Sequence, residues 1–233
     1  MSELGNSVTK SAKFIAKIGE QVESMIQLIT TNLSDSCKNI EKYYYPSEDW
    51  KYRTRYDQYE WVLSDYSCCI GLKLKEKKKS NPKSDPIGYL IIQISLWQDG
   101  AEFVGNEEPL IHISWWDDPI EIDKDNNYFG SLFGDDEDFV IESSVLINWN
   151  PEAKTIQEQR WSYSLLLTSI NSLDDIKNKI VNPVIDLFNK GIEKVVLSIS
   201  KIDGIVAYKR SSDQPKRSLQ VISSVESVGS PHF

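Results

Sequence analysis

The chain has 233 residues, of which 40% are hydrophobic and 26% are charged, and its net charge is −9. Seven Trp and eleven Tyr residues supply enough large rings to exclude a mostly disordered chain. The three cysteines exclude a disulfide framework, because the count is odd and Cys68 and Cys69 are adjacent. No apolar run is long enough to span a bilayer, and residues 1–10 lack the layout of a signal peptide, so we expect a cytoplasmic protein with no membrane attachment.

The first predicted element is an amphipathic helix over residues 8–33. Its apolar residues recur every three or four positions and therefore share one face, formed by Ile15, Ile18, Val22, Met25, Ile29 and Leu33. We expect this face to pack on the protein's own sheet. The pattern also nearly fits a heptad repeat, so a homodimer through the N-terminal helix stays open as an alternative.

The middle of the chain predicts strands. Residues 50–74 are rich in aromatic side chains and indicate one or two strands, which an exposed, lysine-rich loop over residues 73–83 follows. Four further segments alternate apolar and polar residues with period two, and they are residues 87–97, 110–116, 139–149 and 161–168. Because no long helical pattern separates them, we expect antiparallel pairing. At least two of the four tryptophans on these strands should be buried: Trp97, Trp115, Trp149 and Trp161.

A second helix is predicted near residues 172–190. Ser172 followed by Asp175 resembles a capping box, Pro183 should kink the helix, and Gly191 should end it. After it, the alternation over residues 195–200 predicts another strand, and Asp203-Gly204 predicts a tight hairpin.

The order of these elements favours the α+β class. We expect an antiparallel sheet of about five to seven strands, with a long N-terminal helix and the second helix. One domain should cover residues 1–210, and residues 211–233 should form a mobile C-terminal tail, since they are rich in Ser and poor in large rings.

Motifs for catalysis or metal binding are weak. His112 is interpreted as a strand histidine bonded to a neighbour or to solvent, because nothing in the sequence supplies a positioned partner and nucleophile. The stretch from Asp123 to Asn127 starts like a calcium loop but lacks the required Gly and Glu. Cys68 and Cys69 would point to opposite faces of a strand and so suit one zinc ion poorly. We therefore predict no cofactor, no metal site and no catalytic residue.

The acidic residues are concentrated in one stretch. Residues 97–142 hold fourteen acidic residues and a single lysine, a net charge of −13, so the remainder of the chain carries +4. Aromatic rings interrupt this stretch, and rings set among charges are typical of partner-binding surfaces. We predict a partner-binding surface made of Trp115, Trp116, Asp117, Asp118, Asp135, Asp136, Glu137 and Asp138.

The leading hypothesis is a non-catalytic, inhibitor-like binding module with a basic protein partner. By analogy of size and charge alone, a bacterial immunity or phage-defence accessory protein would fit. The alternative is a divalent-metal-dependent hydrolase or nuclease that uses clustered carboxylates at strand ends, Asp117, Asp118, Asp138 and Glu142. Nucleic acid is a less favoured partner, because acidic residues dominate the net charge.

Overall fold

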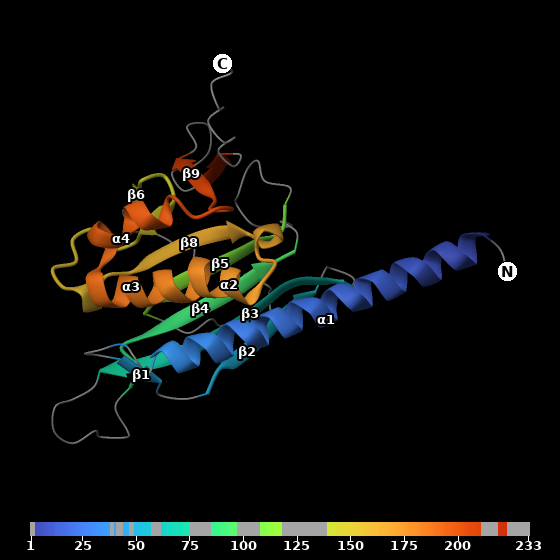
Figure 1. The fold of residues 1–233 in the computed structure, drawn as a ribbon, viewed down its shortest axis with the longest axis horizontal. Coiled ribbons are helices and arrows are strands. Elements are labelled where there is room, and N and C mark those ends of the chain that lie inside the picture. The colour runs from blue at the N-terminus through green and yellow to red at the C-terminus, as the bar shows by residue number, and fades with distance from the viewer. Residues whose placement is uncertain are drawn as a thin grey trace, which may run out of the picture.

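A long helix packed along an antiparallel sheet dominates the computed structural model of the protein (Figure 1). The structure describes residues 3–37, 40, 44–46, 49–56, 62–74, 85–96, 108–117, 139–210 and 219–222. The helix, α1, spans Glu3–Cys37 and is longer than predicted at both ends. The α+β class predicted from the sequence is confirmed. Among the described residues, no helix is both long enough and apolar enough to cross a membrane.

The described part of the main sheet follows the strand order β1-β3-β4-β5-β8-β7-β6, and β2 also pairs with β3. All of its pairings are antiparallel, as expected. The strands are β1 (Tyr44–Pro46), β2 (Lys51–Tyr56), β3 (Leu63–Leu74), β4 (Gly88–Ser95), β5 (Leu110–Trp116), β6 (Val140–Glu142), β7 (Leu146–Asn148) and β8 (Trp161–Leu166). The predicted lysine-rich loop begins two residues too early, because β3 continues to Leu74 and Lys73 is buried in it. Residues 75–83 lie outside the described residues.

One predicted strand is instead a hairpin. Residues 139–149 form β6 and β7, which pair with each other across a turn at Ser143 and Ser144. Both serines have positive φ angles, 48° and 61°. Non-glycine residues rarely adopt this region. The turn was not predicted because Ser-Ser stands where an Asn-Gly or Asp-Gly pair would have indicated a hairpin.

The second helix begins where predicted and is interrupted. Ser172 caps α2 (Leu173–Asp175) by accepting a hydrogen bond from the Asp175 backbone N–H at 3.1 Å. A π-helical segment, η3 (Ile176–Val181), then leads into α3 (Asn182–Lys190), which has Pro183 in its first turn. The proline cannot donate a backbone hydrogen bond, and this fits the change of helix type just before it. Gly191 ends α3 with a φ of 79°.

The prediction of a strand over residues 195–200 is wrong, because residues 195–199 belong to helix α4 (Ile192–Ile199) and Ser200 caps its C-terminal end. The predicted hairpin at Asp203-Gly204 is also wrong. Gly204 has a φ of 80° in a turn that leads from α4 toward β9 (Ala207–Arg210). In the segment expected to be a mobile tail, β10 (Leu219–Ile222) pairs with β9 to form a separate two-stranded sheet.

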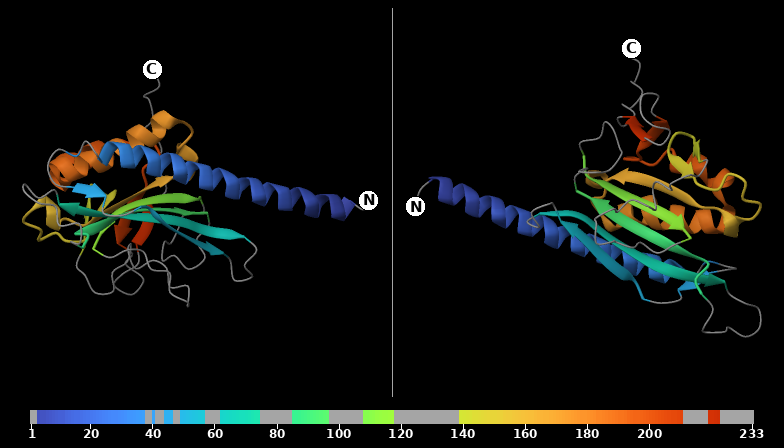
Figure 2. Two further views of the ribbon diagram at one scale, coloured as in Figure 1. Left: turned by 90° about the horizontal axis from the view of Figure 1, so that it is seen from below. Right: turned by 180° about the vertical axis from the view of Figure 1, so that it is seen from behind.

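The two faces of the main sheet are covered differently. Helices α1, η3, α3 and α4 lie on one face (Figure 2, left) and enclose the large apolar core. A smaller apolar cluster lies on the other face. It includes Tyr208 from strand β9 together with Phe139, Ile147 and Trp149. Trp115, Trp149 and Trp161 are all at most 2% exposed, which confirms the prediction of at least two buried tryptophans, and Trp97 lies outside the described residues.

Candidate functional site

The two predicted site tryptophans on β5 point in opposite directions, because successive strand residues face opposite sides of a sheet. Trp115 faces the helices, is 1% exposed and meets Phe188 edge to face, with ring centroids 5.1 Å apart. Its assignment to a partner-binding surface is therefore corrected: the ring belongs to the core. Trp116 is half-buried on the other face, where its ring lies 5.4 Å from that of Trp149.

Asp117 directly follows β5 and forms an ion pair with Arg160. Its Oδ1 accepts hydrogen bonds from Arg160 Nε at 2.6 Å and from Nη2. The arginine also donates to the backbone oxygens of Gln157 and Gln159, at 2.8 and 2.9 Å. The Asp117 side chain remains 63% exposed, whereas that of Arg160 is 13% exposed. Asp117 is thus accessible to a partner, but its charge is already balanced within the protein.

The other predicted acidic site residues, Asp118, Asp135, Asp136, Glu137 and Asp138, lie outside the described residues. The chain returns to the described part at Phe139, whose ring lies 5.2 Å from that of Trp149. Arg210 stacks over the Phe139 ring at 4.4 Å and donates a hydrogen bond to the Phe139 backbone oxygen. Phe139, the first described residue after these acidic positions, is therefore held in place by Arg210 of β9.

One ring contacts both of the residues that flank the acidic segment, which we define as residues 117–138. Trp149 contacts Trp116 on one side and Phe139 on the other. Its Nε1 donates a hydrogen bond to Ser162 Oγ at 2.9 Å, which fixes the ring against β8. The acidic segment has nine acidic residues and one lysine, a net charge of −8. The residues on either side of it belong to one aromatic cluster, formed by Trp116, Phe139 and Trp149.

His112 lies in a buried row of polar side chains. It is 2% exposed, and its Nδ1 lies 2.7 Å from Ser164 Oγ on β8. The prediction that this histidine bonds to a neighbour is confirmed. Burial lowers the pKa of His112 from 6.5 to about 3, so the imidazole is neutral at physiological pH. Burial also raises the pKa of Tyr208, and a hydrogen bond to Ser164 opposes part of that effect.

Farther along the same face, Asp65 is 1% exposed and is held by two neighbours on β4. Its Oδ1 accepts hydrogen bonds from Gln93 Nε2 at 3.2 Å and from Ser95 Oγ at 2.7 Å. Polar positions of an alternating strand ordinarily face solvent, whereas the structure buries those of these strands. The residue types at these positions indicated burial, because Ser, Gln and His can satisfy one another's hydrogen bonds inside a protein, whereas Lys and Glu rarely can.

The carboxylates of the alternative hydrolase do not assemble within the described residues. Asp117 is engaged with Arg160, Glu142 is half-buried on β6, and Asp118 and Asp138 lie outside. In the described part of the chain, no three His, Cys, Asp or Glu side chains gather in a way that could hold a metal ion. Cys68 and Cys69 are buried neighbours in β3, and burial raises the pKa of Cys68 well above its ordinary value.

Comparisons with protein-family models, with curated proteins and with solved structures found no match. Function must therefore be argued from the chain's own residues.

Proposed function

We propose that the protein is a non-catalytic, inhibitor-like binding module that engages a basic protein partner. The partner surface consists of the acidic segment together with the exposed part of Trp116. By analogy of size and charge alone, a bacterial immunity or phage-defence accessory protein would fit this description. Charge accelerates and orients encounter, and a ring contributes contact area once the complex forms.

The observation that carries the proposal is the contact of Trp149 with both residues that flank the acidic segment, Trp116 and Phe139. Binding residues are commonly presented by loops whose ends a rigid scaffold holds. Trp149 is a fixed part of such a scaffold, since it is 2% exposed and its ring donates a hydrogen bond to Ser162. In a chain whose total charge is −9, a net charge of −8 thus lies in the sequence between two residues that contact the same ring. A field concentrated in this way attracts a cationic surface over about one Debye length, about 8 Å at physiological salt.

The proposal is tested by capture from a native lysate with the full chain as bait, at several salt concentrations. Asp135, Asp136 and Asp138 are changed together to Asn, which removes three charges and keeps side-chain size. We expect the wild type to retain a basic protein that elutes as salt increases. The triple variant should bind it more slowly and with a weaker dependence on salt.

A matched control removes the same number of charges elsewhere. The control variant carries three substitutions at exposed positions outside the acidic segment: Glu152→Gln, Asp174→Asn and Glu193→Gln. It should bind as the wild type does. Equal binding of the wild type and the Asn variant, at low as well as high salt, would place the interface elsewhere. A homodimer through the N-terminal helix is a separate proposal, because it concerns a different surface of the molecule.

A further inference from the structure

The N-terminal half of α1 extends beyond the sheet, as Figures 1 and 2 show. Helix α1 has 35 residues, so it is about 52 Å long. Its C-terminal half is anchored in the core, where Ile26, Ile29 and Leu33 are 0% exposed. In contrast, residues 5–17 are all exposed. An isolated helix of about this length is marginal in water, so a projecting helical segment calls for a partner.

The projecting half carries the same apolar stripe as the buried half. Val8, Ile15, Val22 and Ile29 follow one another at intervals of seven residues. The last two are buried at 5% and 0% exposure, whereas Val8 is 62% and Ile15 is 39% exposed. Phe14, beside this stripe, is 65% exposed. The helix therefore presents to solvent the face that it uses for packing where it lies on the core.

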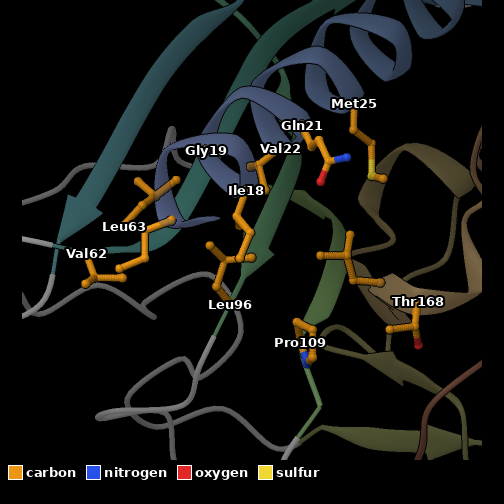
Figure 3. A pocket seen from close by; sticks show the side chains of 12 residues that line it. Ile18, Gly19, Gln21, Val22, Met25, Val62, Leu63, Leu96, Pro109 and Thr168 are labelled. Atoms are coloured by element: carbon orange, nitrogen blue, oxygen red, sulfur yellow. The ribbon is translucent and has the colours of Figure 1, made fainter. Parts of the chain in front are cut away.

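An apolar groove lies at the point where this stripe leaves the core (Figure 3). Its volume is about 630 Å³. One wall is α1 itself, through Ile18, Val22 and Met25, and the opposite wall comes from the ends of the sheet strands, through Leu63, Leu96 and Leu167. Gly19 also lines the groove, and a Cβ added to it would meet no atom within 4 Å. The chain's own packing thus does not require glycine there, whereas close approach of another helix would favour it.

We propose that the protein forms a homodimer in which the two α1 helices pair antiparallel. The projecting half of each helix fills the groove of the other copy. One two-fold axis near residue 16, between the exposed stripe and the groove, satisfies both surfaces at once, because each copy supplies one apolar stripe and one groove. Such an interface is isologous and closed, which is the commonest form of assembly for soluble proteins.

Charge and connectivity select the antiparallel orientation. Lys10, Lys13 and Lys17 make the projecting half basic, and Glu20 and Glu23 make the following turn acidic. Antiparallel pairing brings the basic part of one helix beside the acidic part of the other, and parallel pairing brings like charges together. The folded body is attached to the C-terminal half of α1, so an antiparallel pair also places the two bodies at opposite ends.

The assembly is tested by measuring the mass of the full chain by sedimentation between about 1 and 100 µM. The wild type should be a dimer that dissociates on dilution. Val8→Asp with Ile15→Asp places charges at positions that are exposed within one copy, so the monomer should fold normally, as its circular dichroism will show. The dimer dissociation constant should rise at least about 100-fold, because the charges would be buried without partners.

The matched control is Leu28→Asp, which is on the same helix, 50% exposed and off the apolar stripe. This variant should dimerise as the wild type does. Orientation is tested with Ser7→Cys under mild oxidation, since the native cysteines in the described residues are buried. For an axis near residue 16, the two introduced thiols lie about 27 Å apart in the antiparallel pair and should not cross-link.

Several results would overturn the proposal. A monomer at every concentration would do so, whether the groove then proves to take a small apolar molecule or a helix of another protein. So would an unchanged dissociation constant in the Val8/Ile15 variant. Rapid cross-linking of the Ser7→Cys variant would show parallel pairing instead.

Discussion

His112 Nδ1 lies 2.7 Å from Ser164 Oγ in the middle of the sheet, between two strands that are both buried. Such a pair resembles the beginning of a nucleophilic dyad. However, both residues are at most 2% exposed, and the groove described above is lined by other residues. The pair therefore stabilises the fold, because each residue satisfies the hydrogen-bonding group of the other inside the protein.

Stability should fall as pH decreases from 6.5 to 5. The folded protein binds a proton at His112 only near pH 3, whereas the unfolded chain binds one below about pH 6.5. The unfolded state therefore gains protons first, and the free energy of unfolding should fall by up to about 1.4 kcal/mol per pH unit. Urea unfolding at half-unit pH steps measures this slope. His112→Gln should flatten the slope, and His232→Ala should leave it unchanged; an equal slope in all three proteins would contradict the assignment.

Replacing Ser164 with Ala should destabilise the fold by about 1–3 kcal/mol, because it removes a hydrogen-bonding partner from two buried groups, His112 and Tyr208. Chemical denaturation of the variant measures the loss. Ser198→Ala, at an exposed position of α4, is the matched control and should change stability by less than about 0.5 kcal/mol. A similar effect of the two substitutions would show that the buried polar row contributes little.

Arg160→Ala should cost more stability than Asp117→Ala. The arginine also donates to two backbone oxygens and lies 5.6 Å over the Trp115 ring, whereas the Asp117 side chain is 63% exposed. The coupling energy between the two residues should be no more than about 1 kcal/mol, as is usual for an exposed ion pair. A double-mutant cycle measures it. A coupling energy of several kcal/mol would mean that the pair is shielded from water.

The sequence predicts best where one periodicity stands alone. Residues 110–116 alternate cleanly, and β5 has these bounds. Residues 195–200 also alternate, and three of them are β-branched, yet residues 195–199 lie in α4. The deciding pattern there includes Ile192: with Val195, Val196 and Ile199 it makes a helical face that packs on the core, while Leu197 is 64% exposed. Both periods fit the segment, and tertiary packing selected the helical one.

The candidate site could be predicted only in part. Trp115 and Trp116 are adjacent, so one of them had to face inward. Trp115 was already among the strand tryptophans expected to be buried, and assigning both rings to one partner surface ignored the alternation of a strand. The pairing of Asp117 with Arg160 joins residues 43 positions apart, and no local pattern reports such a contact. The attachment of Phe139 and Trp116 to Trp149 likewise depends on the β6–β7 hairpin, whose turn has no glycine.

Val22→Asp should lower the free energy of unfolding by at least about 3 kcal/mol. Val22 is 5% exposed at the boundary between the projecting and buried halves of α1, so the change buries a carboxylate without a partner. Leu28→Asp, on the exposed side of the same helix, should change stability by less than about 1 kcal/mol. Thermal unfolding monitored by circular dichroism compares them. A Val22→Asp variant with wild-type stability would contradict the packing of this helix face on the core.

Divalent metal ions should leave the melting temperature unchanged. The alternative hydrolase would hold an ion with Asp117, Asp118, Asp138 and Glu142, but Asp117 already accepts two hydrogen bonds from Arg160. An ion present at 100 times its dissociation constant would stabilise the folded state by about 2.7 kcal/mol, equivalent to roughly 5–10 °C in a chain of this size. Differential scanning fluorimetry with Mg²⁺, Mn²⁺ or Ca²⁺, and with a chelator, resolves a shift far smaller than that. A shift of several degrees that Asp117→Asn abolished would favour the hydrolase over the binding module, because it would show that the carboxylate leaves Arg160 to coordinate the ion.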